Sequence, residues 1–252
     1  MSAPQLSIVI PAYNESRRLP ETLQRLSMFC NDLKITWEVL VVVEKSVDGT
    51  LDLAKAAAAR QANFRVIDPD CHRGKGFAVR RGILEARGQT VLFMDADLSV
   101  PLDEILAVLK YLEEQPETDI VVGSRKHAQS RILKHQSWLR ERMGETFNWI
   151  LRLVAGVRIK DTQCGFKAFR QPAAQAIFSR QQLDGFAFDV EVLLLAERLG
   201  FVSVELPVQW INSPLSHVRI VRDSLRMLCD AVRVRGLVRR KLCAPRGFIS
   251  TQ

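Results

Sequence analysis

The sequence predicts an α/β protein built on an open, mostly parallel sheet with helices on both faces. Short apolar runs rich in β-branched residues alternate with longer helical patterns through the first 123 residues. Such alternation is typical of parallel strands connected by crossover helices. Hydrophobic residues make up 47% and charged residues 25% of the 252 residues, which is the ordinary balance of a globular chain and excludes a largely disordered or fibrous one. No repeat or linker interrupts the pattern, so we expect a single domain over residues 1–252.

The first half contains five apolar runs that predict strands. Most are too short and too uniformly apolar to be amphipathic helices, which favours buried strands. The first run ends before Pro11, which we expect to terminate it. The expected strands are Leu6–Ile10, Trp37–Val43, Phe64–Ile67, Val91–Met94 and Ile120–Gly123.

Helical patterns fill the intervals between these strands. Residues 46–50 have the Ser, Asp, Gly and Thr composition of a turn and helix cap, and Gly88 is suited to stopping the third helix. The expected helices are Leu19–Leu33, Leu51–Gln61, Lys75–Ala86 and Pro101 to about Glu114.

The second half is less regular. Helices are expected over Trp138–Val154 and Val190–Leu199, and Val202–Trp210 alternates like a strand. Pro207 interrupts that strand and therefore predicts a sheet edge. A long basic, amphipathic helix is expected from Arg219 to about Arg240.

Three polar segments directly follow expected strands: Pro11–Glu15, Glu44–Asp48 and Asp95–Ser99. In open α/β sheets, ligands bind beyond the carboxyl ends of the strands. We therefore expect these segments to meet, although they lie far apart in the sequence.

The pair Asp95 and Asp97 is the chemical centre of this region. Hard divalent cations prefer oxygen ligands, and Mg²⁺ typically takes one or two carboxylates together with substrate phosphates. Acids at strand ends also serve as turn and cap residues, so the pair alone is a weak signal. Lys75, at the start of a helix after Gly74, suits an anion, although a plain loop-to-helix junction is equally compatible. Tyr13 suits a nucleobase; the alternative is a helix-capping loop.

The charge is uneven along the chain. Residues 1–120 carry 14 basic and 18 acidic side chains, whereas residues 121–252 carry 22 and 10. The basic half suits an anionic partner such as nucleic acid, a phosphorylated substrate or a membrane surface, with a solvated basic face as the alternative.

The sequence predicts a cytoplasmic protein without a membrane-spanning helix. Its five cysteines are scattered without a paired spacing, it has no signal-peptide pattern, and no apolar run approaches roughly 18 residues.

Several motifs together resemble family-2 glycosyltransferases of the GT-A fold, which is Rossmann-like. Within that family, the chain is most similar to the dolichyl-phosphate β-glucosyltransferases and their prokaryotic polyprenyl-phosphate relatives. The resemblance covers about Leu6 to Arg235. The motifs that carry it are SIVIPAYNE at residues 7–15, SVDGT at 46–50, RGKG at 73–76, DADLS at 95–99 and DTQCGFK at 161–167.

The resemblance implies transfer of a sugar from a nucleotide-sugar to a polyprenyl phosphate, with inversion at the anomeric carbon. Residues 1–123 would bind the nucleotide-sugar and residues 124–252 the acceptor. UDP-glucose is the favoured donor, with GDP-mannose and UDP-N-acetylglucosamine as alternatives, and Mg²⁺ or Mn²⁺ the expected metal. A lipid acceptor implies an anionic membrane surface as a partner, peripheral attachment to its cytoplasmic face, and no nucleic acid.

The family motifs also assign roles to individual residues. The metal would be held by Asp95, Asp97 and Ser99, the donor by Pro11, Ala12, Tyr13, Glu15, Glu44, Lys75, Asp95 and Lys167, and the acceptor phosphate by Arg125 and Arg140, with Arg142 as the substitute for Arg140. The catalytic set would be Asp97, Asp189, Arg125 and Arg140, and Asp189 and Glu191 match the family's FDVEL segment.

The chain departs from the family at Val43, Glu44 and Lys45, where the family usually reads Asp, Asp and Gly. Three rival functions are a glycosyltransferase with a non-lipid acceptor, a nucleotidyltransferase, and an inactive basic protein that binds membranes or nucleic acid. The intact pair of Asp95 and Asp97 argues against the inactive protein.

Overall fold

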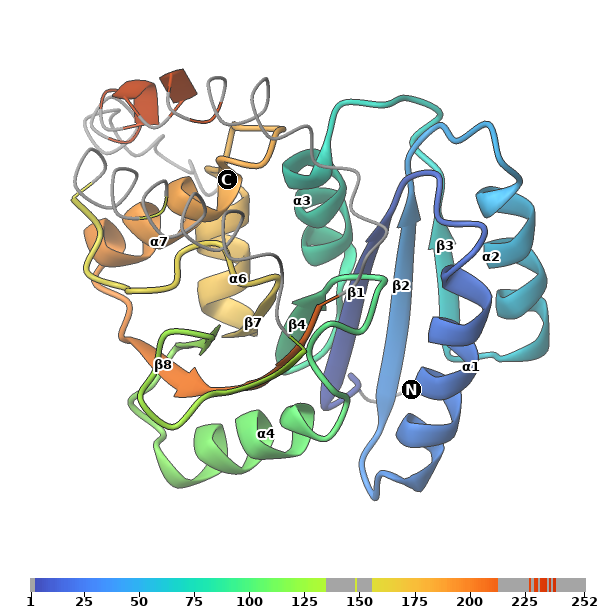
Figure 1. The fold of residues 1–252 in the computed structure, drawn as a ribbon, viewed down its shortest axis with the longest axis horizontal. Coiled ribbons are helices and arrows are strands. Elements are labelled where there is room, and N and C mark those ends of the chain that lie inside the picture. The colour runs from blue at the N-terminus through green and yellow to red at the C-terminus, as the bar shows by residue number, and fades with distance from the viewer. Residues whose placement is uncertain are drawn as a thin grey trace, which may run out of the picture.

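The computed structural model describes residues 3–134, 148, 156–212, 227, 229–230, 232–234, 236 and 238. Five strands and four helices alternate through the first half, as expected (Figure 1). The strands are β1 (Leu6–Ala12), β2 (Trp37–Val43), β3 (Phe64–Ile67), β4 (Thr90–Met94) and β5 (Ile120–Ser124). The helices are α1 (Leu19–Asp32), α2 (Thr50–Arg60), α3 (Lys75–Glu85) and α4 (Glu104–Glu114).

In this half, two boundaries differ from the expectation by more than one residue. Strand β1 continues through Pro11 to Ala12, because its parallel pairing with β2 extends to Ala12 opposite Val43. Helix α4 begins at Glu104, three residues after Pro101.

The second half adds elements that the sequence analysis missed. Strand β6 spans Arg131–Lys134, β7 spans Phe166–Arg170 and α6 spans Gln171–Phe178. Helix α7 (Phe188–Leu199) begins two residues before the expected helix. The single strand expected over Val202–Trp210 is wrong: β8 (Ser203–Pro207) and β9 (Gln209–Ile211) belong to different sheets.

The main sheet has seven strands in the order β3-β2-β1-β4-β7-β5-β8. All its neighbours are parallel except β7, which runs antiparallel to both β4 and β5. Strand β8 lies at the edge, as Pro207 predicts. The chain proceeds outward from β1 to β3 and returns to β4 on the other side of β1, so a topological switch point lies between β1 and β4. Ligands of open α/β sheets bind at such points.

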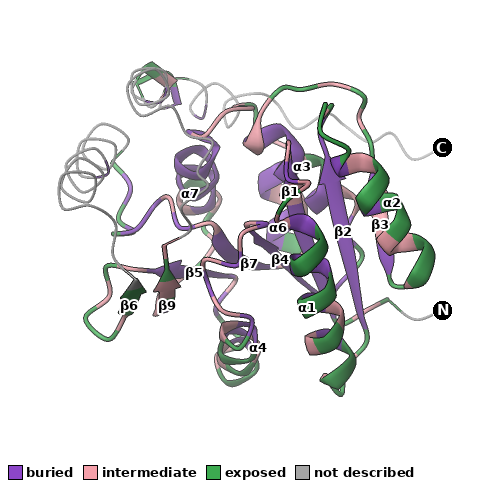
Figure 2. Ribbon diagram, turned by 45° about the vertical axis from the view of Figure 1, so that its right-hand side comes forward, coloured by how far each residue is buried: buried purple, intermediate pink, exposed green. Residues whose placement is uncertain are grey.

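Two hydrophobic clusters cover the two faces of this sheet. One packs side chains of α3, α6 and α7 on one face, and the other packs those of α1, α2 and α4 on the opposite face. Strand residues alternate between the clusters, as Val41 and Val42 do in β2. Figure 2 shows the buried strands, with α1, α2 and α4 exposing their outer sides and α7 buried over most of its length. The expected layering is therefore confirmed.

Two expected helices fall largely outside the described residues. Of Trp138–Val154, only Asn148 is described, and it is helical. In the helix expected over Arg219–Arg240, the described residues are helical, and Met227, Val234 and Val238 are buried in the cluster of α3, α6 and α7. Within the described part of the chain, no helix combines the length and apolar character needed to cross a bilayer.

Candidate active site

The loops after β1 and β2 are tied together by hydrogen bonds at the carboxyl edge of the sheet. The amide of Asn14 donates to Ser46 Oγ at 3.0 Å, and that of Glu15 to Thr50 Oγ1 at 2.8 Å. Asp48 accepts from the amides of Ser16 and Thr50. The turn expected at residues 46–50 is therefore confirmed; the N-cap of α2 is Gly49, which offers no side-chain cap, and Asp48 before it accepts the first helical amide.

Arg18 connects the first loop to the acidic pair after β4. Its Nε donates to the Glu15 carboxylate at 2.6 Å, and its guanidinium lies 3.7 Å from Asp97 Oδ2. The other oxygen of Asp97 accepts the amide of Ser99 at 3.0 Å. The first two polar segments thus contact each other directly, and Arg18 joins the first to the third, so their expected meeting is confirmed.

Asp95 is held between a lysine and a glycine. Lys75, at the first position of α3, places its Nζ 2.6 Å from Asp95 Oδ1. A methyl group at Gly165 would overlap the Asp95 carboxylate, and the Gly165 carbonyl accepts the Asp95 amide at 3.1 Å. Because β7 runs antiparallel beside β4, the glycine of DTQCGFK lies directly against the first acid of DADLS.

Next to Asp95, oppositely charged side chains follow one another: Lys75, Asp189 and Lys167. Burial lowers the pKa of Lys75, but attraction to Asp95 and Asp189 outweighs it and raises the pKa above its usual value. Lys75 therefore remains an ammonium. Asp189, in the first turn of α7, accepts from Lys167 Nζ at 2.6 Å. Burial raises the pKa of Asp189, and Lys167 and Lys75 oppose that rise.

Lys167 requires a correction. The sequence analysis expects it to neutralise a donor phosphate, yet its side chain is 0% exposed. Its ammonium donates to Asp189 and to the Cys164 carbonyl, and it lies over the ring of Phe93. Direct contact with a donor phosphate does not fit this burial, because the Lys167 side chain extends from β7 to Asp189 on α7.

Arg125, just past β5, forms a fork with Asp161. Its Nε and one terminal nitrogen each lie 2.8 Å from a different Asp161 oxygen, and its amide donates to the same carboxylate. Its guanidinium also lies over the Trp210 ring. Burial lowers the pKa of Arg125, but Asp161 and Asp95 together raise it above its usual value. The second expected acceptor arginine, Arg140, and its substitute Arg142 lie outside the described residues.

Tyr13 stacks on His72, with ring centroids 3.8 Å apart and ring planes 9° from parallel. His72 Nδ1 in turn lies 2.9 Å from Glu44. Glu44 is buried and accepts the amides of Arg73 and Gly74, so its oxygens hold the loop before α3. Its direct contact with a base or ribose stays a prediction. Pro11 and Ala12 form the end of β1, and the Ala12 carbonyl accepts the Glu44 amide.

The acidic pair suits a divalent cation. Asp95 and Asp97 offer hard oxygen donors, and they are flanked by the cations of Lys75 and Arg18. Among the described residues, no cluster of three or more His, Cys, Asp or Glu side chains is arranged for a metal. A metal here would therefore depend on donor oxygens. Ser99 borders the pair, but its amide bonds to Asp97.

Comparison with known families identifies the fold and the motifs. Residues 7–178 match the family described as "Glycosyl transferase family 2". The chain belongs to this family. Membership confirms the resemblance and assigns the protein to the glycosyltransferases rather than to the nucleotidyltransferases considered above.

Several curated family-2 relatives are similar over most of their length. "Dolichyl-phosphate beta-glucosyltransferase" of Dictyostelium discoideum is 35% identical over 240 residues, covering 91% of this chain and 73% of that protein. The protein of that name from Saccharomyces cerevisiae is 33% identical over 247 residues (91% and 74%), and that from Homo sapiens is 34% identical over 217 residues (82% and 67%).

Solved structures share the fold. Mannosyl-3-phosphoglycerate synthase from Rubrobacter xylanophilus superposes with a TM-score of 0.67 at 19% identity, covering 99% of this chain and 79% of that one. Glucosyl-3-phosphoglycerate synthase from Mycobacterium tuberculosis, in complex with UDP, gives 0.62 at 19% identity, covering 91% and 80%. The family-2 chain therefore has the GT-A fold.

Sequence reasoning missed three residues of the candidate site, Arg18, His72 and Asp161, and it missed Asp184, which pairs with Arg73 in the loop before Lys75. Only Arg18 had a local signal, because it lies three residues after Glu15 and next to a helix start. Asp161 and Asp184 find their partners 36 and 111 residues away along the chain, so spacing alone could not reveal them.

Proposed function

We propose that this family-2 glycosyltransferase transfers glucose from UDP-glucose to a polyprenyl phosphate such as dolichyl phosphate, with inversion at the anomeric carbon. The observation that carries the proposal is the charged cluster at the switch point, where Asp95 and Asp97 lie against Lys75 and Arg18. The names of the similar curated relatives support glucose as the sugar and dolichyl phosphate as the acceptor.

The donor would lie along the loops after β1, β2 and β4. Tyr13 offers an aromatic surface for the base, and Glu15 is held in place by Arg18. Lys75, kept charged by its acidic neighbours, would attract the diphosphate at the N-terminus of α3.

A divalent cation, Mg²⁺ or Mn²⁺, would be held by Asp95 and Asp97, with Ser99 beside them. Bound there, it would supply a Lewis acid that stabilises negative charge on the leaving diphosphate. Solved relatives with Mn²⁺ and UDP-glucose support a metal and a nucleotide-sugar in this fold.

The acceptor phosphate would approach from the side of Arg125 and Arg140. A phosphate is already ionised near neutral pH, so it needs no strong base to become a nucleophile. Its oxygen would form a bond to the anomeric carbon while the bond from that carbon to the UDP oxygen breaks, which releases UDP. The protein's tasks are then alignment and charge stabilisation, and the fork of Asp161 gives Arg125 a fixed orientation for the first.

A lipid acceptor would require peripheral contact with the cytoplasmic face of a membrane. The basic second half supports this, as do the exposed apolar side chains of Ile132, Leu133 and Ile211 on the small sheet of β6 and β9. Sedimentation with anionic vesicles should carry the protein down at low salt and less at high salt. No sedimentation at low salt would contradict the membrane part of the proposal.

The decisive experiment is a panel of radiolabelled UDP-glucose, GDP-mannose and UDP-N-acetylglucosamine with a polyprenyl phosphate, with and without Mn²⁺. We expect metal-dependent transfer of glucose into the organic phase and release of UDP. A water-soluble product would indicate a non-lipid acceptor, whereas release of pyrophosphate would indicate nucleotidyl transfer.

Asp97→Ala should abolish transfer. Asp189→Ala should keep measurable activity if Asp189 only orients groups, and complete loss in a folded Asp189 variant would indicate a required base.

A further inference from the structure

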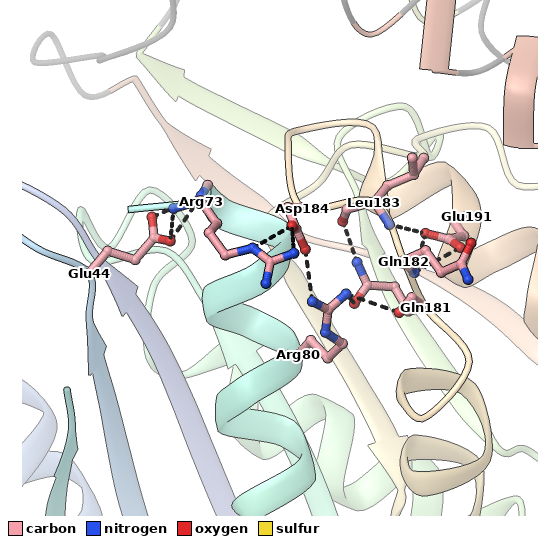
Figure 3. Close-up of polar contacts among 9 residues, drawn as sticks. Glu44, Arg73, Arg80, Gln181, Gln182, Leu183, Asp184 and Glu191 are labelled. Carbon is pink, nitrogen blue, oxygen red and sulfur yellow. Dashed lines mark hydrogen bonds and ion pairs between the residues drawn. The ribbon is translucent and has the colours of Figure 1, made fainter. Parts of the chain in front are cut away.

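Asp184 joins two segments that come from distant parts of the chain (Figure 3). Its Oδ2 accepts from Arg73 Nε at 2.8 Å and lies 2.6 Å from a terminal nitrogen of the same guanidinium. Its Oδ1 lies 2.8 Å from Arg80 on α3. Arg73 belongs to the loop before α3, and Asp184 belongs to the loop of residues 181–187 between α6 and α7. One carboxylate thus links both loops through two arginines.

The backbones of these loops are packed equally closely. The Phe77 amide donates to the Asp184 carbonyl at 3.2 Å. A Cβ at Gly74 would lie 2.7 Å from that carbonyl, and one at Gly76 would overlap the Leu183 carbonyl. The glycines of RGKG therefore allow the 181–187 loop to lie against the first turn of α3.

Each of the two loops is also held by a buried carboxylate. Glu44, at the end of β2, accepts the amides of Arg73 and Gly74 at 2.8 and 2.9 Å. Glu191, in α7, accepts the amides of Gln182 and Leu183 at 3.0 and 2.7 Å. Figure 3 shows Asp184 lying between these two anchors. Both anchors are buried, so each loop is held at its far end as well as at the junction where Asp184 and Arg73 meet.

The same loops carry two charged groups of the candidate active site. Lys75 directly follows Gly74 and contacts Asp95, and Asp189 follows the 181–187 loop and acts electrostatically on Lys75. A shift of either loop therefore changes the distance between Lys75 and the acidic pair.

We propose that Asp184 is a positioning residue that acts through Arg73 and the first turn of α3 to hold Lys75 against the donor diphosphate. This inference rests on the proposed function. Asp184 touches no reacting atom; it sets the geometry of a group that does.

The test compares Asp184→Asn and Arg73→Gln with the wild type in calorimetric titration with UDP and with GDP, each in the presence of Mn²⁺. Charge-assisted hydrogen bonds in a partly buried site contribute enough that we expect roughly tenfold weaker binding in each variant. The KM for the sugar donor should rise by a similar factor, with a smaller change in kcat. The double variant should be little worse than either single one, because the two residues act as a unit.

Two further variants separate positioning from general stability. Arg81→Gln removes an ion pair between Arg81 and Glu85 within α3, at 2.9 Å, and should leave UDP affinity unchanged. Asp184→Glu keeps the charge and should bind UDP more tightly than Asp184→Asn. A merely structural role would lower the melting temperature and leave the dissociation constant and KM unchanged.

Two results would overturn the inference. If the wild type binds UDP and Asp184→Asn binds it equally well, the positioning role is wrong while the proposed function stands. If the wild type binds GDP and not UDP, the UDP-glucose donor is wrong, and equal GDP affinity in Asp184→Asn would overturn the positioning role as well. If the wild type binds neither nucleotide, the proposed function fails and the inference fails with it.

Discussion

Close steric and electrostatic contacts hold the Asp95 side chain in place. Asp95 has an ammonium on one side and a glycine on the other, and Gly165 is required there because any side chain would overlap the carboxylate. Cys164, beside it, is buried, and burial raises the pKa of its thiol to about 12. Cys164 is therefore a packing residue rather than a nucleophile.

Gly165→Ala should lower the rate of sugar transfer about a hundredfold, because a displacement of the Asp95 carboxylate by about 1 Å has consequences of that size. Steady-state kinetics with the labelled donor measures the effect. Gly236→Ala is the matched control, since a Cβ there meets nothing within 4 Å. Wild-type kinetics in Gly165→Ala would show that Asp95 tolerates a shift.

Lys167 and Asp189 should behave as a buried pair in unfolding experiments. Asp189→Leu leaves the Lys167 ammonium buried without its counter-ion and should lower the free energy of unfolding by about 3–5 kcal/mol. The double variant Lys167→Met/Asp189→Leu should lose much less, because an apolar pair replaces the charges. Urea unfolding measures both, and equal losses in the single and double variants would argue against coupling.

At the scale of elements, the sequence predicted the strands made of mostly apolar, β-branched runs and missed β6 and β7, which carry two charged residues each. The strands β2 and β3 appear with the expected bounds, since apolar β-branched runs such as residues 37–43 suit only a covered parallel strand. Strand β7 has the sequence FKAFR, and its Lys167 and Arg170 concealed it. The partners of those two charges lie far away along the chain, so no local pattern reveals that they are satisfied.

Arg170, at the end of β7 away from the acidic pair, stabilises the end of α4. Its Nε donates to the Thr118 carbonyl at 2.8 Å, and a terminal nitrogen donates to the Leu112 carbonyl at 2.6 Å. Arg170→Met should lower the free energy of unfolding by about 1–3 kcal/mol, since buried carbonyls lose their donors. The donor KM should stay at the wild-type value. A raised KM would show that strain at this end of β7 reaches the site.

At the scale of the whole molecule, one ion pair should shape stability in acid. Burial raises the pKa of Asp161, but Arg125 outweighs it and lowers the pKa to about 2. The unfolded value is about 3.9, so this contribution to stability is complete above that pH and is lost as the pH falls toward 2. In Asp161→Asn, the free energy of unfolding should therefore depend less on pH between about 4 and 2. Denaturation at a series of pH values measures this, and parallel profiles would contradict it.

For the candidate site too, the sequence predicts features that depend on neighbouring residues and misses those that depend on residues far apart in the chain. Its location was predictable, because strand ends of a parallel sheet converge and the acids of DADLS follow a strand. Its internal contacts were not, because Arg125 meets Asp161, and Arg73 meets Asp184, only through the tertiary fold.

The antiparallel strand β7 comes from the second half of the chain but is hydrogen-bonded between β4 and β5 of the first half. We therefore expect that a fragment of residues 1–123 does not fold as an autonomous nucleotide-binding unit. Without β7, the backbone hydrogen bonds that join β4 to β5 through it are lost. Within the described residues, the two halves share one continuous sheet, so we expect a lipid phosphate and a sugar nucleotide to meet at its carboxyl edge, between loops rather than between two separate domains.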